Sequence, residues 1–314
     1  MTWYGNEPNL DWCYLGERGF QEPFFDQTIR AHLQNPLNHQ LRRTGISELL
    51  SLAQARPMLP LSGMIFHMSR CGSTLITRVL AADPTNLVIA EAPPIDEVLD
   101  TGRRSIHDDI RAQWLHAMIT AIGQPRSGHE RRMFLKFDSW HIHDLPLIRQ
   151  VFPEVPWIFV YREPIEVIVS HQRLRGMQMA PGQIAPERLG LEASAAQVPF
   201  DLDRFCAQVI GNFCRSAAHY VDQFGGKPIN YRDYPDTIWR DILPLFAVHP
   251  TAEIRELMEL ELQYHAKHPG HPFAPDSAGK RHAASPAQHQ LAAEFAQQPY
   301  AQLEEQRLRH SIYR

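Results

Sequence analysis

The strongest chemical signal in the sequence is a short run between an apolar strand and a helix, Ser69-Arg70-Cys71-Gly72-Ser73-Thr74. Gly72 allows a tight turn, so that successive backbone amides can point at one anion. A helix that starts at Ser73 adds its positive dipole end, worth roughly 0.3–1 kcal/mol. Arg70 adds a full charge, and Ser73 and Thr74 add hydroxyl donors. The run therefore predicts a site for a nucleotide-type anion, and the alternative is an ordinary helix N-cap.

This loop differs from the phosphate loop of ATP-binding proteins. The Walker A pattern is G-x-x-x-x-G-K-[ST], and here no lysine precedes Ser73. The cation, Arg70, stands before the glycine instead. This difference argues against ordinary ATP chemistry.

Charged residues also follow the other apolar runs that read as strands. They are Glu91, Lys136 with Asp138, Arg162, and Arg232 with Asp233. In an open parallel sheet, ligands bind beyond the carboxyl ends of the strands. The sequence therefore predicts that these side chains meet in one site.

The elements that would position these residues alternate along the chain. The expected strands cover residues 64–68, 87–90, 133–137, 157–161 and 228–231. The expected helices between and after them cover residues 73–82, 110–122, 145–151, 165–173 and 202–224, and the remainder reads as mostly helical. Strands separated by helices imply right-handed βαβ units. The predicted fold is α/β, a P-loop-type parallel sheet of about five strands flanked by helices.

Two segments fall outside this alternation. Residues 1–60 are loosely ordered, with helices expected over residues 25–33 and 45–55, and read as an N-terminal extension packed on the main domain of residues 61–314. Residues 176–198 are rich in Gly and Pro and long for a loop, which is typical of a lid or substrate loop.

Bulk properties narrow the class of protein. The 314 residues carry a formal net charge of -4, which argues against a general nucleic-acid binder. Four cysteines without CxxC spacing favour a reducing, cytoplasmic compartment. We expect no signal peptide and no membrane span. The sequence does not specify the oligomeric state and is compatible with a homodimer.

The ordered motifs resemble the P-loop sulfotransferases that use 3′-phosphoadenosine 5′-phosphosulfate (PAPS). Arg70-Cys71-Gly72-Ser73-Thr74 is similar to their 5′-phosphosulfate loop, [KR]-x-G-[ST]-T. Arg162, followed by Ser170 within the next helix, matches their 3′-phosphate motif. Residues 229–233 look like the Tyr-Glu-Asp end of the family's later strand. The resemblance covers about residues 63–290.

The catalytic end looks most like the tyrosylprotein sulfotransferase branch. There a glutamate about twenty residues after the loop arginine acts as base, and Glu91 has the corresponding spacing. Lys136 is similar to that branch's lysine after the third strand. Small-molecule sulfotransferases use a histidine base in this segment, so His141 and His143 stay open as alternatives. Glu91 could instead serve only as an ion-pair partner of Arg70 or Lys136.

The resemblance implies a role for each residue. The loop Arg70, Cys71, Gly72, Ser73 and Thr74 would hold the 5′-phosphosulfate, with Lys136 at the transferring group and Glu91 as general base. Arg162 and Ser170 would hold the 3′-phosphate, and Lys280 and Arg281 would close over it. PAPS would be the co-substrate and 3′-phosphoadenosine 5′-phosphate (PAP) the product. No metal is expected, because the spacing of His265, His268 and His271 fits no zinc pattern.

Two other functions compete with sulfuryl transfer. A P-loop kinase acting on a small molecule would use Asp138 for Mg²⁺, but the loop lacks a triphosphate-holding lysine. A non-catalytic member would keep the fold as a nucleotide-binding module. The acceptor class, whether sugar, lipid, phenol or peptide, is not specified by the sequence.

Overall fold

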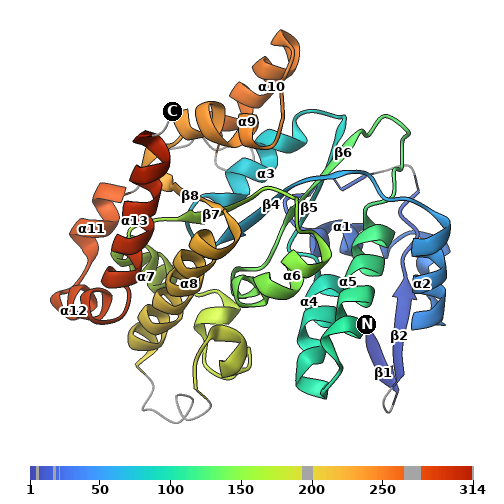
Figure 1. Ribbon diagram of the computed structural model, residues 1–314, viewed down its shortest axis with the longest axis horizontal. Helices are drawn as coiled ribbons and strands as arrows, with labels where there is room; N and C mark the ends of the chain where they lie inside the picture. Colours follow the sequence, from blue (N-terminus) through green and yellow to red (C-terminus); the bar gives the residue numbers. More distant parts are fainter. Residues whose placement is uncertain (5–6, 17–18, 21, 193–200, 265–276, 313–314) are drawn as a thin grey trace.

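The computed structural model describes residues 1–4, 7–16, 19–20, 22–192, 201–264 and 277–312. Its centre is a five-stranded parallel sheet, with helices distributed around it (Figure 1). The five strands are β4 (Leu61–His67), β5 (Asn86–Ala90), β6 (Arg132–Lys136), β7 (Trp157–Tyr161) and β8 (Lys227–Asn230). The predicted α/β class and its parallel five-stranded sheet are confirmed.

The strand order β5-β6-β4-β7-β8 places β4 in the middle of the sheet. After β4 the chain forms β5 and β6 on one side of it, and then β7 and β8 on the other side. The direction in which strands are added therefore reverses next to β4. In open α/β sheets the ligand crevice lies at such a reversal, outside the carboxyl ends of the strands. The loop that follows β4 therefore occupies the position at which this fold binds ligands.

Burial on both faces explains the composition of the inner strands. In β4, every side chain from Gly63 to His67 is buried, and all five residues of β7 are buried. A strand covered by helices on both faces reads as a continuous apolar run rather than an alternating one. His67 is the polar exception at the end of β4, which marks it as a residue with a role beyond packing.

Helices cover the sheet and extend beyond it. They are α1 (Phe25–His32), α2 (Ile46–Ala55), α3 (Ser73–Ala81), α4 (Pro93–Asp100), α5 (Asp108–Ile122), α6 (Leu145–Val151), α7 (Pro164–Arg173), α8 (Leu202–Phe224), α9 (Leu243–Leu245), α10 (Ala252–Gln263), α11 (Ser277–Ala283), α12 (Pro286–Phe295) and α13 (Gln297–Ile312). The longest, α8, starts at an Asp201 cap and ends at Gly225 in the left-handed region. It packs against α7, α12 and α13, which lie on the same side of the molecule in Figure 1.

The N-terminal sixty residues contain a small sheet that the sequence did not predict. Strands β1 (Thr2–Tyr4), β2 (Glu7–Trp12) and β3 (Arg42–Gly45) pair antiparallel in that order. Strand β2 alternates polar and apolar residues, but Pro8 and Asn9 disfavour a strand, and β2 and β3 are distant in sequence, so no local signal indicates the pairing. Helix α2 packs on α5, which joins this unit to the helices beside the large sheet.

Several predicted boundaries were wrong by one to three residues, and one of them matters for the site. Strand β8 ends at Asn230, and Tyr231–Asp233 form a 3-10 turn instead of a strand end. Part of the predicted lid is ordered into two 3-10 turns, Met177–Met179 and Pro186–Leu189. Residues 193–198 of that segment, and His265, His268 and His271, lie outside the described residues.

No helix in the described ranges has both the length and the apolar character needed to cross a bilayer.

Candidate anion-binding active site

A cavity of about 380 Å³ lies beyond the carboxyl ends of the parallel strands. The side chains or backbone that line it come from every one of these strand ends and from the segment after α7. Its lining residues are His67, Ser69, Arg70, Cys71, Gly72, Ser73, Thr74, Leu75, Glu91, Lys136, Asp138, Ser139, Trp140, Arg162, Ser170, His171, Gly176, Met177, Gln178, Tyr231 and Lys280.

The charge of the cavity is opposite to that of the whole chain. Its lining includes Arg70, Lys136, Arg162 and Lys280, against two acids, Glu91 and Asp138. The net charge of the chain is -4. A concentration of cations in a partly enclosed cavity favours an anionic ligand.

The loop after β4 has the backbone geometry of an anion cradle. Ser69, Arg70 and Gly72 have positive φ angles of 75°, 50° and 84°. Such left-handed residues turn successive N–H groups toward one side, and α3 begins directly afterwards. Left-handed conformations are strained for Ser and Arg and are typical of functional sites.

Gly72 is required by close packing as well as by its φ angle. A Cβ atom there would lie 2.5 Å from a ring carbon of Tyr231. The Tyr231 ring also stacks under Arg162, whose guanidinium carbon lies 4.5 Å from the ring centroid. Tyr231 thus joins the loop to the second predicted phosphate site, a role that the sequence did not reveal.

Cys71 serves the turn and shows no activated chemistry. It is fully buried, and its thiol donates to the carbonyl of Val160 at 3.1 Å. Burial raises the pKa of the Cys71 thiol to about 11, so that the thiol form dominates at neutral pH. Cys71 is therefore best explained as a small, buried residue that fits the turn.

Glu91 and Lys136 meet at the ends of adjacent strands. The Lys136 ammonium donates to Glu91 Oε1, and the Glu91 amide donates to the Lys136 carbonyl at 2.8 Å. Glu91 has a φ of 52°, another strained residue at the cavity. Burial opposes ionisation of Glu91, but the charge of Lys136 and the neighbouring His67 outweigh it and hold the Glu91 pKa well below its usual range. The ion pair expected as an alternative does form, with Lys136.

His67 is a further member of this group that the sequence analysis missed. Its Nδ1 accepts the amide of Ser69 at 3.1 Å, and its Nε2 lies 3.3 Å from Glu91 Oε1. Because Nδ1 accepts a hydrogen bond, the ring proton sits on Nε2, facing Glu91. The available signal was a polar residue at the end of an otherwise apolar strand.

Arg162 and Ser170 lie on the cavity as expected, and Arg162 is firmly positioned. Arg162 is almost fully buried, pairs with Glu166 and donates to Ser277 Oγ at 2.9 Å. Ser277 begins α11, so this contact fixes the C-terminal helices against the strand end. These contacts, made at Nε and at one terminal nitrogen, fix the orientation of the guanidinium at the cavity.

Lys280 and Arg281 take different positions. Lys280 is buried and lines the cavity. Arg281 is half exposed and pairs with Glu163 at 3.1 Å and Glu166 at 3.0 Å. Arg281 is absent from the lining, so its closest link to the cavity is through Glu166, the partner of Arg162.

The two histidines considered as bases lie behind the cavity wall rather than on it. His141 uses both ring nitrogens: Nδ1 accepts the amide of Asp138 at 3.2 Å, and Nε2 donates to Asp96 at 2.7 Å. His143 bonds Ser216 at 2.9 Å, and burial lowers its pKa to about 4. Neither lines the cavity. Their geometry favours scaffold roles.

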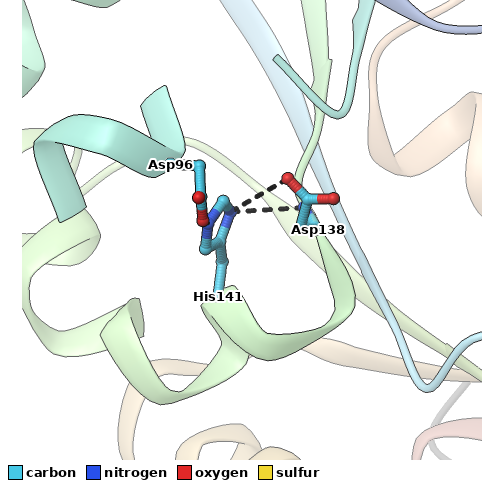
Figure 2. A group of neighbouring side chains, drawn as sticks. All are labelled: Asp96, Asp138 and His141. Carbon is cyan, nitrogen blue, oxygen red and sulfur yellow. Dashed lines mark hydrogen bonds and ion pairs between the residues drawn. The ribbon is translucent and has the colours of Figure 1, made fainter. Parts of the chain in front are cut away.

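Asp96, Asp138 and His141 gather close enough to suggest a metal site, as Figure 2 shows. However, Asp96 Oδ1 also accepts from Trp140 at 2.7 Å and from Arg188 at 2.6 Å. Three protein donors, one of them a cation, already surround that oxygen. This donor set fits a hydrogen-bonded scaffold that fixes the backbone of Asp138 better than it fits a cation.

No protein-family model matches the chain, and no curated protein sequence matches it either. Several solved structures are similar. Sulfotransferase STF9 from Mycobacterium avium shares 16% identity over 87% of this chain and 85% of its own, with a TM-score of 0.47. The sulfotransferase domain of the Synechococcus PCC 7002 olefin synthase shares 16% identity with this chain, over 76% of this chain and 95% of its own length, with a TM-score of 0.47. A sulfotransferase from Alicyclobacillus acidocaldarius shares 15% identity with this chain, over 80% of this chain and 96% of its own length, with a TM-score of 0.45. Similarities this distant do not assign a substrate or a residue role to this chain.

Proposed function

We propose that this protein transfers a sulfuryl group from PAPS to a hydroxyl or amine of an acceptor. The observation that carries the proposal is that two groups of cationic and hydrogen-bond-donating residues line one cavity. One is the loop 69–74, and the other is Arg162 with Ser170 and Lys280. PAPS carries anions at its two ends, a 5′-phosphosulfate and a 3′-phosphate, so a single ligand would satisfy both sites.

In the proposed reaction the acceptor oxygen or nitrogen forms a bond to sulfur as the bond from sulfur to the bridging oxygen breaks. The products are the sulfated acceptor and PAP. The loop amides and Arg70 bind the phosphosulfate and hold the sulfur in line with the acceptor. Such positioning and preorganised charge supply most of the rate enhancement in the related phosphoryl transfers.

Glu91 is proposed as the general base that takes the acceptor proton. Its pairing with Lys136 depresses its basicity, and the same pairing suggests how it is activated. The phosphosulfate would compete for Lys136, which then stabilises the developing charge on the bridging oxygen. Glu91, relieved of that cation, would regain a pKa closer to the ordinary range, which a base needs.

Calorimetry with PAP tests the binding part of the proposal. The wild type is expected to bind PAP, and Arg162→Ala is expected to lose binding by at least about tenfold, since charge-assisted contacts to phosphate are worth about 1.5–3 kcal/mol. Arg173→Ala is the matched control, because Arg173 is an exposed arginine at the end of α7, the helix that follows Arg162. Absence of PAP and PAPS binding in the wild type, with magnesium-dependent ATP binding in its place, would favour a small-molecule kinase.

A second variant separates an enzyme from a binding module. Glu91→Gln keeps the shape of the side chain and is expected to retain PAP binding within about threefold. Turnover of PAPS with a screened panel of acceptors is expected to fall by about 10²–10⁴-fold, the usual contribution of a general base. Unchanged turnover in Glu91→Gln would assign the proton transfer to another group.

A further inference from the structure

Ser69, the residue before the loop arginine, has an unusually complete set of hydrogen-bond donors around its hydroxyl. It is buried, lines the cavity and has a φ of 75°. Gln178 Nε2 donates to Ser69 Oγ at 2.8 Å, and His171 Nε2 lies 3.2 Å from the same oxygen. Ser69 follows β4, whereas His171 and Gln178 come from α7 and the 3-10 turn after it, and all three line the cavity.

The protonation of His171 decides the direction of its contact with Ser69. The amide of Gly176 donates to His171 Nδ1 at 3.2 Å, so Nδ1 carries no proton. A neutral imidazole then carries its proton on Nε2, and that N–H donates to Ser69 Oγ. His171 is fully buried, so these two protein contacts fix its tautomer.

The serine oxygen therefore accepts twice, from Gln178 and from His171. A hydroxyl has two acceptor positions and one donor. With both acceptor positions filled, the Ser69 proton must point elsewhere, and no acceptor for it occurs among the residues that the structure describes. A buried hydroxyl proton facing a cationic cavity is a preorganised donor for an anion.

We propose that the Ser69 hydroxyl is a binding residue for the sulfonate of the donor, held in its donating orientation by His171 and Gln178. This inference rests on the proposed function. The sulfonate end is favoured because the Ser69 amide bonds His67, and His67 lies beside Glu91. Ser69 thus stands between the amides of the loop and the proposed base, where the transferring group must lie.

The test compares PAPS with PAP by calorimetry, because the two ligands differ by the sulfonate. Ser69→Ala is expected to weaken PAPS binding by about 10- to 100-fold, in the range of a hydrogen bond to a charged group. PAP binding is expected to change less than threefold. Thr77→Val is the matched control, since the Thr77 hydroxyl bonds the Thr74 carbonyl at 2.9 Å and lies outside the cavity lining. It should leave both affinities unchanged.

A second variant, Ser69→Gly, separates the loss of the hydroxyl from misfolding caused by the substitution. Glycine adopts a φ of 75° without strain, so this variant removes the hydroxyl without adding the backbone strain that alanine adds there. It is expected to show the same selective loss of PAPS affinity. Wild-type PAPS affinity in both variants, or equal losses for PAPS and PAP, would overturn the inference.

Failure of the proposed function would be seen separately, as wild-type protein that binds neither PAP nor PAPS. In that case pyrophosphate, another linked pair of tetrahedral oxyanions, is the probe. The Ser69 donor then predicts weaker pyrophosphate binding in Ser69→Gly than in Thr77→Val. Equal pyrophosphate affinities in the two variants would reject Ser69 as an anion-binding residue regardless of the donor.

Discussion

Two carboxylates face the cavity, and their surroundings separate their properties. Glu91 is surrounded by donors, Lys136 and His67, which keep it ionised. For Asp138, burial raises the pKa to about 7, and the negative charges of Glu91 and Asp96 act in the same direction. A pair of acids whose pKa values are driven apart is typical of sites that move protons. The charge of Asp138 therefore changes near neutral pH.

The raised pKa of Asp138 predicts how stability depends on pH. Because the folded protein holds the Asp138 proton more tightly than the unfolded chain, its contribution to stability is present below about pH 4, the ordinary range. That contribution is lost as pH rises to about 7. Asp138→Asn removes the ionisation, so its melting temperature should exceed that of the wild type at pH 8.5 and show little gain at pH 4.5.

Asp96→Asn is the contrasting control for this measurement. Burial opposes ionisation of Asp96, but hydrogen bonds from His141 and Arg188 outweigh it and hold the Asp96 pKa below its usual range. Its ionised form is therefore stabilised, and the amide should lower the melting temperature at both pH values. A melting temperature of Asp138→Asn that tracks the wild type at all pH values would contradict the assigned environment of Asp138.

At the residue scale, most of the charged residues that follow strands could be predicted from the sequence, whereas His67 and Gln178 were missed. Arg70, Glu91, Lys136 and Arg162 line one cavity because parallel strands bring their carboxyl ends together. Gln178 reaches the cavity through contacts that no sequence period encodes. Its position depends on the packing of the segment after α7 against the loop.

At the element scale, the close approach of α8 to the end of α12 depends on a single glycine. A Cβ atom at Gly211 would lie 2.1 Å from the carbonyl oxygen of Phe295. This neighbour is backbone, so relief requires a shift of α12 rather than a rotamer change. Gly211→Ala is expected to destabilise the protein by about 1–3 kcal/mol or more, as overpacking does.

Gly279→Ala provides the matched control for Gly211→Ala. Gly279 lies in α11 with nothing within 4 Å of its would-be Cβ atom. Alanine has the higher helix propensity, so this change should be neutral or stabilising by up to about 1 kcal/mol. Denaturant titration of both variants measures the difference. Equal stabilities would mean that α8 and α12 are not packed this closely.

An element could be predicted from the sequence when its own residues carry the signals that form it. Helix α8 carries its amphipathic pattern, its Asp201 cap and its Gly225 stop within its own residues, and its predicted range is confirmed. Strand β1 is only three residues long, and its partner β2 contains Pro8 and Asn9. Within the described residues, β1 pairs only with β2, and β2 pairs with the distant β3, so both strands depend on contacts that their own residues do not specify.

At the scale of the whole molecule, the N-terminal unit and the large sheet share contacts through α5. Trp3 of β1 lies 6.3 Å from Trp114 of α5, and the Arg104 guanidinium lies 4.2 Å from the Trp3 ring centroid. Leu49 of α2 is fully buried and belongs to the core that includes the strands. Because of these contacts, we expect residues 1–60 to unfold together with residues 61–314.

Thermal unfolding of Leu49→Ala tests whether the molecule unfolds as one cooperative unit. Truncation of a fully buried leucine removes apolar burial and leaves a cavity, which costs about 2–5 kcal/mol. If residues 1–60 and the main domain share one core, a single transition should move to lower temperature.

Gln54→Ala, an exposed change in the same helix, should leave the transition in place. PAP affinity below the transition should be unchanged in both variants, because neither residue lines the cavity. An early minor transition in Leu49→Ala, followed by a main transition at the wild-type temperature, would instead show that the N-terminal unit unfolds independently.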